Sequence, residues 1–226
     1  MEQYLNYLLQ LLQEMGEAYR IPTSFVVIEF VGTFAFALSG IRLASAKRFD
    51  VFGAWIVGMA TAVGGGTLRD LMLGVEPFWM SNPIYFLCCA FAVLWVMAFR
   101  KYLVQQSNAW FIFDTIGLAL FNVIGIEKTL NMGLPYWMAI TMGSVTGSAG
   151  GIIRDVLINE VPLIFRKEIY AVACVAGGAV YALCHWGALS GEISALLSSI
   201  TVISIRLLAV KYHWSLPIVK GEEEQI

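Results

Sequence analysis

Two short motifs in the sequence place glycines shortly before an arginine–aspartate pair. Residues 64–70 read Gly-Gly-Gly-Thr-Leu-Arg-Asp, and residues 150–155 read Gly-Gly-Ile-Ile-Arg-Asp. Each glycine costs a helix about 1 kcal/mol relative to alanine, so three in a row favour a kink or local unwinding. Unwound backbone exposes carbonyl oxygens, which can replace part of a cation's hydration shell. The motifs therefore predict a place where cations pass.

Hydroxyl side chains lie within about a turn of both glycine runs and would add ligands to such a site. We expect transient cation binding at the kink carbonyls, with no tightly bound metal and no cofactor. The other interpretation is close helix packing, because small residues let backbones approach and residues 143–147 form a GxxxG sequence. The candidate pathway residues are Gly64, Gly65, Gly66, Thr67, Asp70, Thr146, Ser148, Gly150, Gly151 and Asp155.

Charged side chains within the apolar segments suggest two ion pairs. Ionisable groups inside a membrane are costly and usually face a bundle interior or a water-filled cavity. Neighbouring side chains on a helix point about 100° apart, so Arg69 and Asp70 are not expected to cap each other. The pairs either flank a pathway or only fasten helices together. The predicted pairs are Glu29–Arg69 and Asp114–Arg154, which leaves Asp70 and Asp155 to attract cations.

Membrane-spanning helices must carry these residues. The 226-residue chain is 59% hydrophobic and 13% charged, whereas soluble proteins are about 45–50% apolar and about 25% charged. This composition excludes a soluble fold, and a net charge of −2 without a basic patch excludes a nucleic-acid partner. Apolar segments of about 20 residues form helices in a membrane. The seven predicted spans are 23–43, 51–73, 83–100, 109–126, 135–158, 168–186 and 193–210.

Basic residues between the spans predict the orientation of the chain. Only Arg20 and Lys128 fall on one side, and nine fall on the other. The positive-inside rule then places the amino terminus outside and the carboxyl terminus, with tail 213–226, in the cytoplasm. Arg206, near the end of the seventh span, is expected to snorkel to the cytoplasmic interface. The nine are Arg42, Lys47, Arg48, Arg100, Lys101, Arg166, Lys167, Lys211 and Lys220.

The chain repeats itself at an offset of 85 residues. The two glycine–Arg–Asp motifs lie in register, and the same offset aligns Gly32 with Gly117 and Phe36 with Phe121. Each repeat holds three spans, so the second copy must enter the membrane from the opposite side. We expect an all-α polytopic membrane protein with an inverted 3+3 repeat and an unpaired seventh helix. The expected units are an interfacial helix or frayed tail 1–20, repeats 21–106 and 107–190, and helix 191–212.

Residues 64–70, 74–78 and 150–157 resemble the bacterial trimeric intracellular cation (TRIC) channels, whose repeat domain has also been labelled a glycine transporter. The resemblance covers nearly the whole chain after residue 20. It implies a homotrimer in the bacterial inner membrane, in contact with lipid and with no soluble protein partner. It also implies one hourglass pore per protomer, between the repeats and beside the kinks, which conducts K⁺ above other ions. Ala149 departs from a second glycine triplet, so the two kinks are not identical.

The favoured function is therefore a passive, K⁺-permeable cation channel, with Na⁺ as a second permeant ion and no enzymatic activity. The alternative is a secondary transporter for a small zwitterion such as glycine, whose carboxylate would bind at half-helix amino termini. A membrane scaffold without transport is a third class. It leaves the duplicated motif without a role.

Overall fold

The computed structural model describes residues 5–6, 9–10, 23–99, 109–166 and 169–217. The predicted segment 1–20 lies outside these residues except for four positions, and the tail beyond residue 217 lies outside them as well. Within the described residues there are seven α-helices, which agree with the seven predicted spans to within five residues at each end. They are α2 (Thr23–Ala46), α3 (Val51–Met72), α4 (Ile84–Ala98), α6 (Ala109–Asn131), α7 (Tyr136–Leu157), α8 (Ala171–Trp186) and α9 (Gly191–Lys211).

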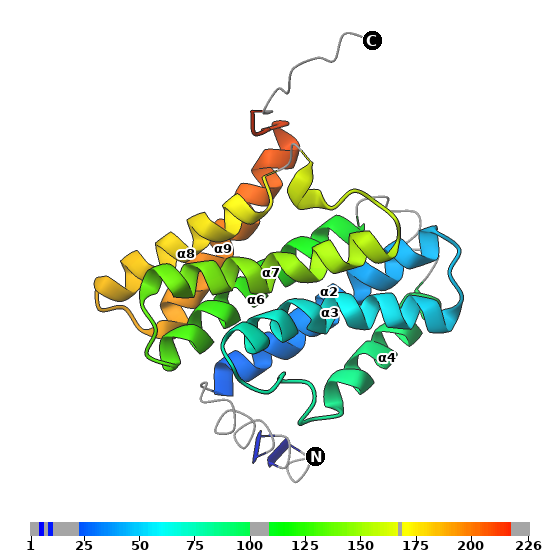
Figure 1. Cartoon of the computed structure of the whole chain (residues 1–226), viewed down its shortest axis with the longest axis horizontal. Coiled ribbons are helices and arrows are strands. Elements are labelled where there is room, and N and C mark those ends of the chain that lie inside the picture. The colour runs from blue at the N-terminus through cyan, green and yellow to red at the C-terminus, as the bar shows by residue number, and fades with distance from the viewer. Residues whose placement is uncertain (1–4, 7–8, 11–22, 100–108, 167–168, 218–226) are drawn as a thin grey trace.

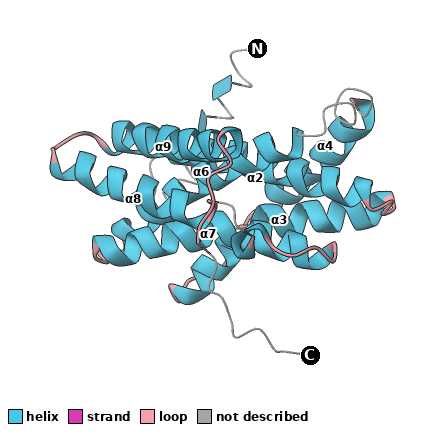
Figure 2. Ribbon diagram, turned by 90° about the horizontal axis from the view of Figure 1, so that it is seen from above, coloured by secondary structure: helices cyan, strands magenta, loops and turns pink. Residues whose placement is uncertain are grey.

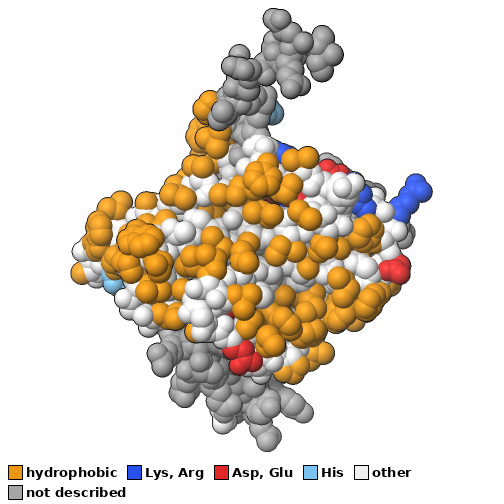
Figure 3. Space-filling view, viewed as in Figure 1, with side chains coloured by type: hydrophobic (Ala, Val, Ile, Leu, Met, Phe, Trp, Pro, Cys, Tyr) orange, Lys and Arg blue, Asp and Glu red, His pale blue; other side chains and the backbone are white. Residues whose placement is uncertain are grey.

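The lengths and composition of four of the helices suit a bilayer. A helix of 22 residues, such as α3, is about 33 Å long, and the hydrocarbon core of a bilayer is about 30 Å thick. The helices α2, α3, α6 and α9 are long and apolar enough to cross it, and α4 and α8 are shorter apolar helices. Hydrophobic side chains spread over the visible face of the molecule, with charged groups mostly toward its rims (Figure 3). The predicted all-helical membrane fold is confirmed.

Four helices form the centre of the molecule. The helices α2, α3, α6 and α7 pack together there, with α4 on one flank and α8 and α9 on the other (Figure 1). The view from above shows the same order (Figure 2). A short 3₁₀ turn, Leu163–Phe165, follows α7. The central helices carry the charged and glycine-rich segments, so the arrangement brings both motifs to the middle of the fold.

The two repeats meet through reciprocal contacts between α2 and α6. Gly32 packs against the ring of Phe121, and Gly117 packs against the ring of Phe36. The two rings stack on each other with centroids 5.3 Å apart. As the chain advances along α2 the partner on α6 moves backwards, so the helices are antiparallel. A pseudo-twofold axis therefore passes between Phe36 and Phe121, as an inverted repeat requires.

Within each repeat the first two helices approach through glycines. Gly40 of α2 lies against the backbone of Gly58 on α3. Gly125 of α6 lies against the backbone of Gly143 on α7, which is the same contact 85 residues later. Small residues at these crossings let backbones touch, as in other membrane helix pairs. At residue 143 the packing interpretation of the GxxxG sequence therefore holds.

Candidate functional site

The two glycine motifs face each other where α3 crosses α7. A β-carbon on Gly65 would overlap the carbonyl oxygen of Thr146, and one on Gly150 would overlap the carbonyl oxygen of Thr61. Gly64 is looser, because a β-carbon there would meet only the flexible end of the Ile153 side chain, at 2.6 Å. The two helices are antiparallel, and the pseudo-twofold axis relates the contact at Gly65 to the contact at Gly150. Backbone touches backbone here because glycine leaves no side chain in between.

The expected unwinding at the glycines is wrong. Both α3 and α7 run through their glycines as continuous helices. The nearby hydroxyls bond within their own helices, Thr67 to the carbonyl of Val63 at 2.7 Å and Ser148 to that of Ser144 at 2.6 Å. Thr146 bonds in the same way to the carbonyl four residues earlier. In this state the glycines serve close packing, and tertiary contact outweighs their poor helix propensity.

The remaining motif glycines pack against aromatic side chains. A β-carbon on Gly66 would overlap the ring of Phe78, and one on Gly151 would overlap the hydroxyl of Tyr170. The segments that follow α3 and α7 therefore fold back onto the motifs. This return brings backbone N–H groups to the aspartates of both motifs.

The first charged cluster lies near the predicted outer end of α3. Arg69 donates from Nε to Oδ1 of Asp70 at 2.7 Å, and Lys128 Nζ lies 2.9 Å from the same oxygen. The other carboxylate oxygen of Asp70 accepts the backbone N–H of Phe78 at 2.9 Å. Glu29 accepts a hydrogen bond from Tyr85 at 2.9 Å. We name Glu29, Arg69, Asp70 and Lys128 the outer cluster, and all four side chains are buried.

The predicted Glu29–Arg69 salt bridge is therefore wrong, as is the expectation that Arg69 and Asp70 cannot pair. The Cβ directions of neighbouring helix residues diverge by about 100°, but they do not limit where a long side chain ends. A long arginine side chain can bend so that Nε reaches the next residue. Glu29 stays within electrostatic range of Arg69 and Lys128 without a direct bridge to Arg69.

The second charged cluster lies near the predicted cytoplasmic end of α7. Arg154 donates from Nε to Asp155 Oδ1 at 2.9 Å and from Nη1 to the hydroxyl of Ser39 at 2.9 Å. It also forms a direct salt bridge with Asp114 through Nη1, so the structure brings that predicted pair together. Asp155 Oδ2 accepts the backbone N–H of Leu163 at 3.1 Å. This geometry repeats that of Arg69, Asp70 and Phe78.

Neither motif aspartate is left to attract cations. Both carboxylates are buried, each is paired with the preceding arginine, and each accepts a backbone N–H. Such hydrogen bonds keep a carboxylate satisfied without a bound ion. Among the residues that the structure describes, no three His, Cys, Asp or Glu side chains are grouped to hold a metal ion. The motif aspartates thus stabilise the ends of the α3–α7 contact.

Two members of this arrangement differ from the prediction. The sequence predicts Lys128 in an outer loop, but it lies in the last turn of α6 and is only 7% exposed. The sequence predicts that Arg206 snorkels, but it is fully buried on α9. Both lie near helix ends, where a basic residue usually reaches the interface. Only their proximity in space to the repeat carboxylates distinguishes them.

Cavities open toward both predicted faces of the bundle. On the predicted outer face, a cavity of about 410 Å³ is lined by the carboxylates of Glu127 and Glu192 and by the rings of Tyr136, Tyr181 and His185. The Tyr181 hydroxyl donates to Glu127. On the opposite face, a cavity of about 270 Å³ is lined by Asp155 and Glu160 together with Lys47 and Arg166. The carboxylates of the first cavity raise the local concentration of cations, whereas Lys47 and Arg166 offset those of the second.

Glu160 joins the two repeats at the rim of the second cavity. It accepts a hydrogen bond from Lys47 at 2.6 Å and one from Arg166 at 3.1 Å, and all three side chains are exposed. The hydrogen bond and charge of Lys47, followed by the charge of Arg166, lower the pKa of the Glu160 carboxyl. A carboxyl with a lowered folded-state pKa adds stability above its unfolded pKa, and that stability is lost as pH falls through the folded value.

We expect Glu160→Gln to lower the thermal midpoint slightly at neutral pH, because exposed salt bridges contribute little. The difference from wild type should begin to shrink as pH falls below the ordinary pKa of glutamate, about 4.3. It should vanish once pH is below the lower folded-state pKa of Glu160. Thermal unfolding in detergent across this range measures the effect. Glu192→Gln, an exposed carboxylate on the other face, is the matched control. A difference that persists in acid would contradict the assigned role of Glu160.

The fold and the paired clusters define a polytopic helical membrane protein of the inverted-repeat class. A sequence model described as "Glycine transporter" matches residues 26–101 and 111–186, one copy in each repeat. The UPF0126 inner membrane protein YadS of Escherichia coli K12 is 38% identical over 84% of this chain and 93% of its own length. A UPF0126 membrane protein of Vibrio cholerae is 42% identical over 84% of this chain and 81% of its own length.

Solved structures give the same assignment. The TRIC trimeric intracellular cation channel orthologue from Rhodobacter sphaeroides superposes with a TM-score of 0.80 at 33% identity, over 85% of this chain and all of that one. A trimeric intracellular cation channel from C. elegans shares the fold at a TM-score of 0.57 and 15% identity, over 93% of this chain and 99% of that one. The chain belongs to the bacterial TRIC channel family.

Proposed function

We propose that the protein is a passive, K⁺-permeable channel for monovalent cations, with one pathway in each protomer along the contact between α3 and α7. We further propose a homotrimer in the bacterial inner membrane, with the amino terminus outside and the carboxyl terminus in the cytoplasm. The observation that carries the proposal is the placement of two buried charge clusters, each about one turn beyond a motif glycine, at opposite ends of that contact.

Three further observations support this proposal. The related solved structures are cation channels. Cavities open toward both predicted faces, and the described residues that line the one on the predicted outer face include carboxylates but no Lys or Arg. Nη1 and Nη2 of Arg69 and Nη2 of Arg154 are buried and have no hydrogen-bond partner among the described residues. Buried polar groups of this kind are usually hydrated, which favours a water-accessible path beside the clusters.

In this proposal, the structure with α3 and α7 tightly crossed is the closed state of the channel. Backbone contact at Gly65 and Gly150 leaves no passage between the two helices at that level. Conduction then requires α3 and α7 to separate or slide, a small helix shift of a kind common in switching proteins. The two charge clusters would stay neutral and hydrated, and they would line the pathway at opposite ends of the α3–α7 contact.

Single-channel recording of the purified protein in planar bilayers tests the proposal. We expect discrete current steps in KCl and a reversal potential that follows K⁺ in a salt gradient. Saturable glycine uptake into liposomes without such steps would favour the zwitterion transporter, and neither signal would favour a scaffold.

A disulfide between α3 and α7 tests the position of the gate. A β-carbon on Gly64 would lie 3.9 Å from Cβ of Ile153, close to the usual disulfide separation of about 3.8 Å. In Gly64→Cys with Ile153→Cys, oxidation should abolish the current and reduction should restore it. The two single cysteine variants are the controls. Unchanged current in the fully cross-linked protein would move the pathway elsewhere.

A further inference from the structure

The two charged clusters are only partly related by the internal repeat. The offset of 85 residues relates Glu29 to Asp114, Arg69 to Arg154 and Asp70 to Asp155. The repeat therefore gives each cluster three related side chains, of which two are acidic and one is basic. A buried site with this composition keeps one negative charge unless a further cation reaches it, and unbalanced buried charge is costly.

Each cluster receives its second cation from a position that the repeat does not relate. Lys128 of α6 supplies it at the outer cluster, where Nζ lies 2.9 Å from Asp70. At the other cluster Nη2 of Arg206 lies 3.7 Å from Asp114 Oδ2. Arg206 comes from α9, which belongs to neither repeat. We name Asp114, Arg154, Asp155 and Arg206 the inner cluster.

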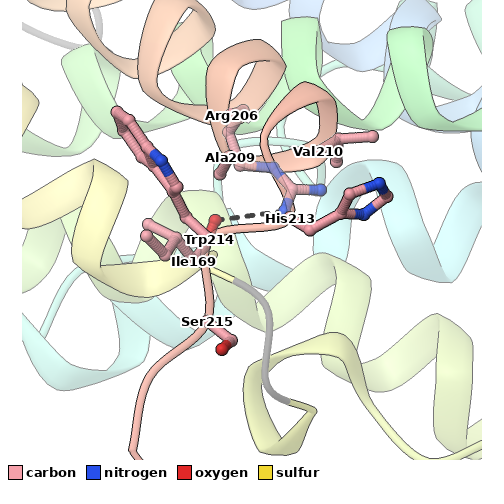
Figure 4. A pocket seen from close by; sticks show the side chains of 7 residues that line it. All are labelled: Ile169, Arg206, Ala209, Val210, His213, Trp214 and Ser215. Atoms are coloured by element: carbon pink, nitrogen blue, oxygen red, sulfur yellow. Dashed lines mark hydrogen bonds between the residues drawn. The ribbon is translucent and has the colours of Figure 1, made fainter.

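Arg206 is held tightly in this position. It is fully buried, and Nη1 donates to the carbonyl of Ile169 at 3.1 Å. Its guanidinium lies over the rings of Phe111 and Tyr170, at 4.8 Å and 4.9 Å from their centroids. Figure 4 shows the bond to Ile169 beside a cavity of about 280 Å³ that Arg206 lines together with His213. The seventh helix thus delivers a fixed charge to the predicted cytoplasmic half.

We propose that Arg206 is a positioning residue of the ion pathway: it holds Asp114 in place from α9 and supplies the charge that neutralises the inner cluster. This inference rests on the proposed channel function. The seventh helix then controls cation entry from the cytoplasmic side alone. Lys128 neutralises the outer cluster and has the same effect on the outer side. Arginine suits this role because it stays charged when buried and stacks on aromatic rings.

Current–voltage curves in symmetric KCl test the proposal. Arg206→Gln leaves one net negative charge near the cytoplasmic mouth, so K⁺ entry from that side should rise about two- to tenfold relative to the opposite direction. Arg206→Lys should restore near-symmetric current. Lys211→Gln removes an exposed charge from the same helix and should rectify little, because solvent screens it. Equal rectification in Arg206→Gln and Lys211→Gln would overturn the proposal, as would failure of lysine to rescue.

A second measurement works even if the wild type carries no current. Thermal unfolding of Arg206→Gln, Asp114→Asn and the double variant forms a double-mutant cycle. We expect the double variant to be at least as stable as Arg206→Gln alone, because it removes the unbalanced carboxylate. Additive losses would overturn the pairing. A silent wild type with strong coupling would instead contradict only the channel function.

Discussion

Gly65→Ala is expected to prevent α3 and α7 from reaching their observed contact. The new β-carbon would overlap the carbonyl oxygen of Thr146, which belongs to a helix backbone and cannot rotate away. Overpacking in a tight core costs about 1–3 kcal/mol and occasionally more, and a backbone clash belongs at the upper end. Gly150→Ala should behave in the same way, because its β-carbon would overlap the carbonyl of Thr61. Thermal unfolding of the purified protein measures both effects.

The same glycine run provides the matched control. In Gly64→Ala the added carbon meets the end of the Ile153 side chain, which can change rotamer. The loss should stay within about 1 kcal/mol, because alanine is also the better helix former. Gly187→Ala, where the nearest atom would lie at 3.4 Å, tests the effect of the substitution alone. Equal stability of Gly64→Ala and Gly65→Ala would show that the crossing is looser than the structure indicates.

Arg154→Ala is expected to be the most damaging charge substitution in the chain. Its guanidinium binds Asp155, Asp114 and Ser39 together, and the side chain is fully buried. Removing it leaves two carboxylates buried without their main partner. Breaking a buried ion pair in this way costs about 3–5 kcal/mol. We expect loss of the folded protein from the membrane fraction, or a large fall in its thermal midpoint.

Two comparisons separate the loss of this buried ion pair from a general loss of stability caused by substitution. Lys47→Ala removes a charge from an exposed ion pair and should cost about 1 kcal/mol or less. Arg154→Gln combined with Asp114→Asn should be more stable than the sum of the single losses predicts, because the two groups pair directly. If Lys47→Ala and Arg154→Ala are equally harmful, the inner cluster is not a buried electrostatic centre.

The sequence predicts the helices well because the bilayer imposes a simple rule. A span must be apolar and about 20 residues long, so the segment bounds follow directly from composition. The internal register predicts more, because glycines, aromatics and the Arg–Asp pairs recur at one offset. This register, together with the predicted topology, predicts the Asp114–Arg154 salt bridge. The register alone does not say whether glycine serves a kink or a packed crossing, since both need a missing side chain.

The side-chain partners of the charged groups were harder to predict. Arg69 pairs with its own neighbour in sequence, and Glu29 pairs with Tyr85, a hydroxyl that no charge pattern identifies. Lys128 and Arg206 complete the clusters from helices that the repeat does not align with them. Such pairings depend on rotamers and on which helices pack together. Periodicity and the positive-inside rule contain neither.

The stacked rings of Phe36 and Phe121 have a consequence for the origin of the chain. A contact in which each copy of a patch meets the other copy is isologous, as in a twofold homodimer. The two repeats are thus joined as if two identical three-helix subunits had inserted in opposite directions and then been fused. In such an ancestor one substitution at this position would have altered both sides of the interface at once. Fusion lets the two phenylalanines vary separately, and α9 adds a charge to one side only.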